Sequence, residues 1–172
     1  MRGKVGLVLL AVLLGAAPLA AAPADPVAVV HSIYAGAANR KMAFGLDPGE
    51  RREFFSKSLV ALWDLADAKS NPTGEEVGAI DFDPSTNSQG ADVKSYTVVS
   101  NQTGGNNATV VVKLVLDNWI RRSPEDDIVR YVFVLEDGRW MIDDMGGSAD
   151  GEGWTIRKLL EINAQDRTRS KE

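Results

Sequence analysis

The chain has 172 residues, of which 44% are hydrophobic and 25% are charged, so it is long and apolar enough to form one domain with its own core. Its net charge of −5 argues against a nucleic acid or an anionic membrane as the main partner, because both attract a cationic face. It has no cysteine and one histidine, which excludes disulfides, thiol catalysis, cysteine-ligated metals and paired-histidine motifs. We therefore expect no cofactor.

The N-terminus has the pattern of a secretory signal peptide. Arg2 and Lys4 precede an apolar run, 5–17, which is shorter than the roughly 20 residues of a membrane-spanning helix. Small residues for cleavage follow in Ala22-Pro23-Ala24. We expect residues 1–24 to be removed near Ala24, the protein to be periplasmic or secreted, and the mature chain not to insert stably into a membrane. An uncleaved N-terminal anchor is the alternative.

Two helix starts follow this leader. Asp25 and Asp47 each precede a proline, the usual order of an N-cap and a first helical residue. Glu50, three residues after Asp47, is expected to bond back to the cap N–H. Apolar residues at helical spacing follow both starts: Val27, Val30, Tyr34, Ala37 and Ala38 in the first, and Phe55, Leu59, Leu62, Trp63 and Ala66 in the second.

The second half of the chain changes to strand patterns. Residues 68–92 have no periodicity and are expected to form a long loop. Turn sequences then separate four predicted strands, which form an antiparallel meander: 93–100, 108–116, 128–136 and 139–145. After them we expect a flexible loop over 146–153, a short last helix over 154–163 and a charged, flexible tail over 164–172. The apolar stripe of that helix is predicted to contain Trp154, Ile156, Leu159, Leu160 and Ile162.

The strand 128–136 is apolar on both faces. Tyr131 and Phe133 point to one side, and Val132 and Val134 to the other. A sheet with one side in water would carry polar residues there, so both faces should be covered. The N-terminal helices can cover one face. The C-terminal segment or a second subunit is expected to cover the other, which makes a homodimer one candidate assembly.

These elements predict an α+β protein: two N-terminal helices packed on a four-stranded antiparallel meander in a cone-like shape, with a short C-terminal helix. The single domain is expected to span 25–163. Three motifs in order resemble a bacterial exported family of unknown function, the DUF family numbered 3828: Pro26-Val27-Ala28-Val29-Val30-His31-Ser32-Ile33-Tyr34, Asp81-Phe82-Asp83-Pro84 with Gln89, and Trp140-Met141-Ile142-Asp143-Asp144-Met145. The resemblance implies the nuclear-transport-factor-like or cystatin-like superfamily and no established activity. Gly90 stands where the family usually has an acidic residue.

The loop 81–92 has oxygen-bearing side chains at the first, third, fifth, ninth and twelfth positions, as in an EF-hand. Thr86 stands where that loop needs glycine, and Asp92 replaces its bidentate glutamate. We therefore expect no metal site, although Asp81, Asp83 and Asp92 are the residues that a metal would use. The expectation instead is a turn in which Asp81 and Asp83 accept backbone N–H bonds. With Gln89 and Trp140 they form the predicted ligand-binding or structural polar cluster.

The catalytic candidates are Asp144, Asp143, His31 and Tyr34. Adjacent strand residues point to opposite faces, so we expect Asp144 beside Trp140 and Ile142, and Asp143 beside Met141 and Met145. A half-buried carboxyl can act as a general acid or base, because burial raises its pKa. The alternative is structural: an aspartate bonded to neighbouring backbone or to Arg130. For His31 the alternative is a place at the edge of the buried helix face.

Three functions follow from these observations. The first is a non-catalytic exported module that binds a small ligand or an envelope protein. The second is a small cone-fold enzyme, an isomerase, dehydratase or hydrolase, that uses an aspartate in the cone mouth. The third is an envelope inhibitor or immunity-type protein. An enzyme requires a deep pocket with convergent polar groups, whereas a binding module functions with a filled interior.

Overall fold

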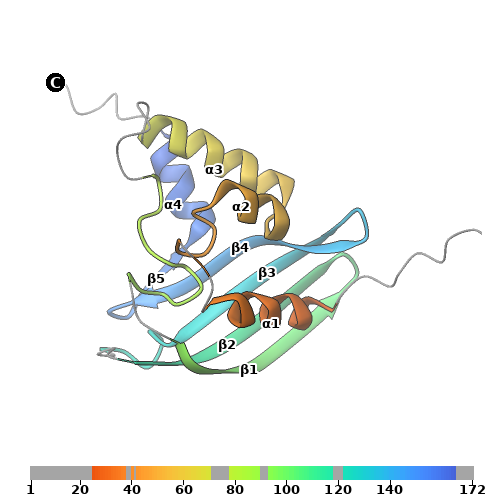
Figure 1. Ribbon diagram of the computed structural model, residues 1–172, viewed down its shortest axis with the longest axis vertical. Coiled ribbons are helices and arrows are strands. Elements are labelled where there is room, and N and C mark those ends of the chain that lie inside the picture. Colours follow the sequence, from red (N-terminus) through yellow and green to blue (C-terminus); the bar gives the residue numbers. More distant parts are fainter. Residues whose placement is uncertain are drawn as a thin grey trace, which may run out of the picture.

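The computed structural model describes residues 25–37, 40, 42–70, 78–89, 93–117 and 122–165. This part of the chain is an α+β structure with four helices and a five-stranded antiparallel sheet (Figure 1). The helices are α1 (Pro26–Gly36), α2 (Pro48–Phe54), α3 (Lys57–Ser70) and α4 (Ile156–Ala164). The strands are β1 (Val93–Gly104), β2 (Asn107–Leu116), β3 (Ile128–Glu136), β4 (Arg139–Ala149) and β5 (Glu152–Thr155), and they pair in chain order. The predicted signal peptide and most of the predicted tail lie outside the described residues.

Both predicted helix starts are confirmed. Asp25 and Asp47 cap α1 and α2, and each side chain accepts a hydrogen bond from the N–H two residues further on. Glu50 does not bond back to its cap as expected. Its carboxylate instead accepts from the Gly45 N–H at 2.8 Å and from the Arg40 guanidinium at 2.7 Å. These bonds connect the segment between α1 and α2 to α2 itself.

The second predicted helix is two helices. The chain is extended at Phe55, which forms an isolated bridge with Ile142 of β4. The Ser56 N–H donates to the Ile142 carbonyl at 2.8 Å, and the Ser56 hydroxyl accepts from the Leu59 N–H at 3.0 Å. Ser56 therefore serves as the N-cap of α3. The break exchanges intrahelical bonds for bonds to β4 and positions both helices against the sheet.

The predicted flexible loop 146–153 instead forms the end of β4 and the start of β5. The sheet therefore has five strands, one more than expected. Gly147 pairs with Trp154, and a Cβ atom on Gly147 would lie 2.7 Å from the indole ring. The two strands approach so closely here that glycine is required, although glycine in the interior of a strand normally weakens it. Trp154 belongs to β5 rather than to the last helix, and Ile162, predicted on that helix's apolar stripe, is 58% exposed.

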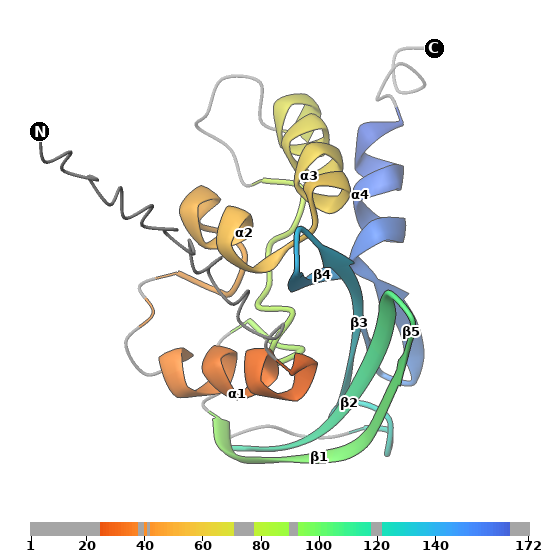
Figure 2. The ribbon, with the colours of Figure 1, turned by 90° about the vertical axis from the view of Figure 1, so that its right-hand side faces the viewer.

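The core lies on the side of the sheet that faces α1, which we call the inner face. Tyr131 and Phe133 of β3 are buried there, whereas Val132 on the opposite, outer face is half-buried. The C-terminal helix α4 lies against α3, β4 and β5, whereas α1 lies against β1 and β2 (Figure 2). No helix in the described residues is long and apolar enough to span a membrane.

Candidate functional site

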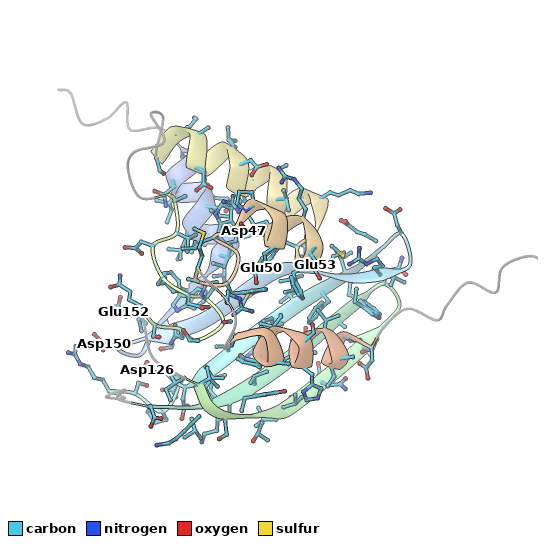
Figure 3. The ribbon with its side chains drawn as sticks, viewed as in Figure 1. Asp47, Glu50, Glu53, Asp126, Asp150 and Glu152 are labelled. Atoms are coloured by element: carbon cyan, nitrogen blue, oxygen red, sulfur yellow. The ribbon has the colours of Figure 1, made fainter. Side chains whose placement is uncertain are left out.

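A pocket of about 160 Å³ opens between α1, the end of α2 and the start of β4. Its lining residues are far apart in sequence: Val29, Ser32, Glu53, Phe54, Arg139 and Trp140. Trp140 is only 8% exposed, and with Phe54 it supplies an aromatic surface. Glu53 and Arg139 are exposed and add one charge of each sign at the rim. Figure 3 shows Glu53 at the end of α2 that lies next to β4.

The turn between β3 and β4 positions this side of the pocket. Asp137 and Gly138 have φ values of 50° and 77°, as expected of a two-residue hairpin turn with the Asp-Gly sequence. Lys57 of α3 pairs with Asp137 at 2.7 Å, but both side chains are exposed, so the pair adds little stability. The Arg139 guanidinium donates to the Glu53 carbonyl at 3.2 Å and thereby connects β4 to α2.

His31 and Tyr34 of α1 lie in different environments, and neither lines the pocket. The Tyr34 hydroxyl is buried 2.8 Å from the Tyr131 hydroxyl. Burial raises the pKa of both tyrosines above the ordinary value, so both stay protonated at neutral pH. His31 is exposed, with Nδ1 2.7 Å from the hydroxyl of Tyr96. The tyrosines fill the space between α1 and the sheet.

The predicted polar cluster is not assembled by any described contact. The Asp83 carboxylate accepts from the Phe44 N–H at 3.1 Å and from the Ser85 N–H at 2.8 Å, so its predicted role in a turn is confirmed. Asp81 and Gln89 are exposed. Trp140 lines the pocket instead. Of the four residues, only Trp140 belongs to the candidate site.

The acidic side chains labelled in Figure 3 form two groups. The first group lies on and just before α2 and consists of Asp47, Glu50 and Glu53. The second lies near the turn between β4 and β5 and consists of Asp126, Asp150 and Glu152. Asp47 caps a helix, Glu50 binds Arg40, and Asp150 pairs with Arg122 at 2.8 Å. Within the described residues, no three His, Cys, Asp or Glu side chains are placed to hold a metal ion. Asp92 of the EF-hand-like loop lies outside those residues.

The two adjacent aspartates are not arranged as the strand alternation predicts. Asp144 pairs with Val132 of β3, and Ile142 pairs with Phe133. Directly paired residues share a face, so Asp144 lies on the outer face and Ile142 on the inner face. Asp143 is an extra residue in the register between them, a β-bulge. The bulge also returns Met145 to the inner face, opposite Tyr131, so the predicted neighbours of both aspartates are wrong.

Both aspartates are bonded within the protein. One Asp144 oxygen accepts from the N–H groups of Met145 at 2.9 Å and Arg157 at 3.0 Å. Burial raises the pKa of Asp144 above its ordinary value, and these N–H bonds offset part of the rise. The Asp143 carboxylate accepts from the Ser56 hydroxyl at 2.6 Å and pairs with the Arg157 guanidinium at 2.5 Å. Asp144 is bonded to neighbouring backbone rather than to Arg130.

The residues that hold this architecture include several that sequence reasoning missed. Asn87, buried with φ of 56°, accepts from the Trp154 indole N–H at 2.6 Å and donates to the Ser148 and Asp126 carbonyls. Burial disfavours the Asp126 carboxylate, but bonds from the Gly151 and Ser123 N–H groups and other donors lower its pKa below the ordinary value. These bonds join segments that are distant in sequence, so the sequence does not predict them. The one local indication is that Asn87 stands in a stretch rich in turn-forming residues.

No protein-family model, no curated protein and no solved structure matches this chain.

Proposed function

We propose that the chain is an exported, non-catalytic module of the cell envelope that binds another protein through the pocket at Trp140. The observation that carries the proposal is the size of the pocket together with its lining. Small-molecule and cofactor sites usually occupy about 300–1,000 Å³. A pocket of about 160 Å³ with an aromatic wall and charges at the rim suits one side chain of a protein partner.

The positions of the catalytic candidates support binding over catalysis. An active site would require convergent polar groups that line an open pocket. Tyr34 and Tyr131 instead contact each other beneath α1, and Tyr131 is fully buried. Asp143 and Asp144 lie outside the pocket and are bonded to Ser56, Arg157 and backbone N–H groups. The enzyme alternative is therefore less well supported than the binding module.

Export remains part of the proposal on the evidence of the sequence. The basic start, the short apolar run and the small residues at 22–24 support a cleaved signal peptide. Mass spectrometry of the secreted or periplasmic fraction should find a chain that begins near Asp25. Recovery of the intact chain in membranes alone would contradict export.

A photo-crosslinking residue at the pocket rim tests the binding proposal. Ser32 lines the pocket and is exposed, so a benzoylphenylalanine placed there should reach a bound side chain. The matched control carries the same residue at the exposed position Lys69 of α3. We expect the Ser32 variant to link to one protein in cells, and the Lys69 variant not to do so. Arg139→Glu, which reverses a rim charge, should reduce that link several-fold.

Three results would contradict the proposal. The first is equal crosslinking from both positions, which would mean that contact at the pocket is not specific. The second is a crosslink from Ser32 that forms only with a small molecule, which would favour a ligand-binding module. A protein crosslink that Arg139→Glu leaves unchanged would place the partner next to the pocket rather than in it.

A further inference from the structure

The outer face of β2 and β3 carries a cluster that the pocket does not use. The register pairs Thr109 with Val132, Val111 with Arg130, and Lys113 with Ile128. Paired residues share a face of the sheet, and Val132 points to the outer face, away from the side on which Tyr131 and Phe133 are buried. We call these six residues the outer-face cluster: Thr109, Val111, Lys113, Ile128, Arg130 and Val132.

No described helix covers this cluster. Figure 2 shows α1 on the other side of the sheet, and α4 lies against β4 and β5. Val111, Ile128 and Val132 are half-buried, and the neighbouring Val115 is 51% exposed. An apolar sheet face is normally buried against a helix or a second sheet. Among the described residues, helices therefore cover the inner face of β2 and β3, and no helix covers their outer face.

The two cations of the cluster have no described partner. Lys113 and Arg130 are exposed and form no side-chain ion pair or hydrogen bond within the described part of the chain, whereas Arg40, Arg51, Lys57, Lys94, Arg122 and Arg157 pair with carboxylates. The two cations are diagonal neighbours on one face, a relationship that places side chains about 7–8 Å apart. Asp144, diagonal to Arg130 on β4, forms no ion pair with it and accepts two N–H bonds instead.

The charge of the cluster decides which occupant fits. In a symmetric dimer whose two-fold axis passes through this cluster, Lys113 and Arg130 of each copy would lie near the same two cations of the other, and like charges in a buried contact cost free energy. A partner with carboxylates would instead satisfy both cations. A free polyanion fits less well, because the whole chain carries a net charge of −5 and a polyanion would make no use of the valines.

We propose that the outer-face cluster binds an amphipathic acidic helix of another protein. The apolar side of that helix packs on Val111, Ile128 and Val132. Carboxylates along its flank pair with Lys113 and Arg130. The helix occupies the position on the outer face that corresponds to α1 on the inner face.

The experiment uses a synthetic 18-residue peptide with leucines on one helical face and glutamates beside them. Its titration into the purified protein is followed by NMR of the backbone amides. We expect saturable shifts at 109–113 and 128–132, and tighter binding at low salt because the charged pairs are exposed. The double variant Lys113→Glu/Arg130→Glu should weaken binding at least tenfold. The matched control Lys69→Glu/Lys158→Glu reverses two exposed cations elsewhere and should leave binding unchanged.

Each alternative occupant gives a distinct result that overturns the proposal. Equal binding of a peptide with lysines in place of the glutamates would show that charge does not select the partner. Equal binding of polyglutamate or of anionic vesicles would show that a polyanion or a lipid surface is sufficient. Concentration-dependent dimerisation that maps to the same amides would assign the face to a second copy, and an absence of saturable shifts would leave it without this function. The crosslink from Ser32 reports on the pocket separately.

Discussion

The Ser56 hydroxyl donates a 2.6 Å hydrogen bond to the Asp143 carboxylate, although the two residues are 87 positions apart. Ser56 is fully buried at the break between α2 and α3, and Asp143 is the bulged residue of β4. The Arg157 guanidinium pairs with the same carboxylate from α4. One aspartate thus joins α3, β4 and α4, so its role in the described structure is to hold these elements together.

Ser56→Ala tests this junction. The variant removes the cap of the Leu59 N–H and one of the donors to Asp143, so we expect it to destabilise the protein by about 1–2 kcal/mol. Ser58→Ala is the matched control, because Ser58 is exposed and only accepts a 3.2 Å bond from Arg157; it should cost less than about 0.5 kcal/mol. Urea unfolding measures both. Equal losses would mean that Ser56 has no special role.

The buried tyrosine pair predicts an order of stabilities. The Tyr34 hydroxyl contacts the Tyr131 hydroxyl and also donates to the Ser85 carbonyl at 2.9 Å. Tyr34→Phe leaves both partners without their bond and should cost about 1–3 kcal/mol. Tyr131→Phe leaves Tyr34 bonded to Ser85 and should cost about 1 kcal/mol or less. Thermal or urea unfolding of the two variants checks the order, and a larger loss for Tyr131→Phe would refute this assignment.

Gly147→Ala tests why β4 and β5 can pair. A Cβ at this position would lie 2.7 Å from the Trp154 ring and 3.0 Å from the Asn87 side-chain oxygen, so the added methyl should cost about 1–3 kcal/mol through overpacking. The control is Gly104→Ala, where no atom lies within 4 Å of the new Cβ and stability should stay the same or rise slightly. Urea unfolding compares the two. An unchanged Gly147→Ala variant would show that this contact relaxes freely.

Asp144 predicts a pH dependence of defined sign. Burial raises its folded pKa above the ordinary value of 3.8, so the folded state keeps this proton to higher pH than the unfolded state. Its contribution to the free energy of unfolding is therefore fully present below pH 3.8 and is lost as pH rises through the folded pKa. Relative to Asp144→Asn, the wild type should lose stability as pH rises from about 4. Urea unfolding of both proteins across pH measures this difference, and the opposite slope would contradict the assignment.

Local sequence patterns predicted the structure correctly wherever a structural feature depends on only a few neighbouring residues. The Asp-Pro pairs at 25–26 and 47–48 supply an N-cap and a preset first helical residue, and both helices begin there. The Asp137-Gly138 turn between two predicted strands and the alternating burial along β2 are equally local features. Asp83 accepts the Ser85 N–H bond in its turn, as expected of an aspartate in a turn. These features depend on backbone geometry and nearest neighbours.

Of the pocket, the sequence indicated only Trp140. The Asp-Gly turn placed Arg139 at the start of a strand, but no pattern connected it to Glu53, which lies 86 residues away. The catalytic candidates were selected by residue type, and the structure assigns Asp143 to a junction and Tyr34 to the interior. A pocket is formed by surfaces from separate elements, so its lining depends on how those elements pack.

The sequence by itself determined the helix starts, the hairpin turns and the inner-face residues of the central strands, because caps, turn conformations and side-chain alternation act over a few residues. Only the tertiary structure decided that the second helix breaks at Phe55, that β5 pairs with β4, and that a bulge at Asp143 reverses the face of Asp144. In each case a long-range contact outweighs the local preference: backbone bonds to β4, close packing at Gly147, or a carboxylate shared by two helices.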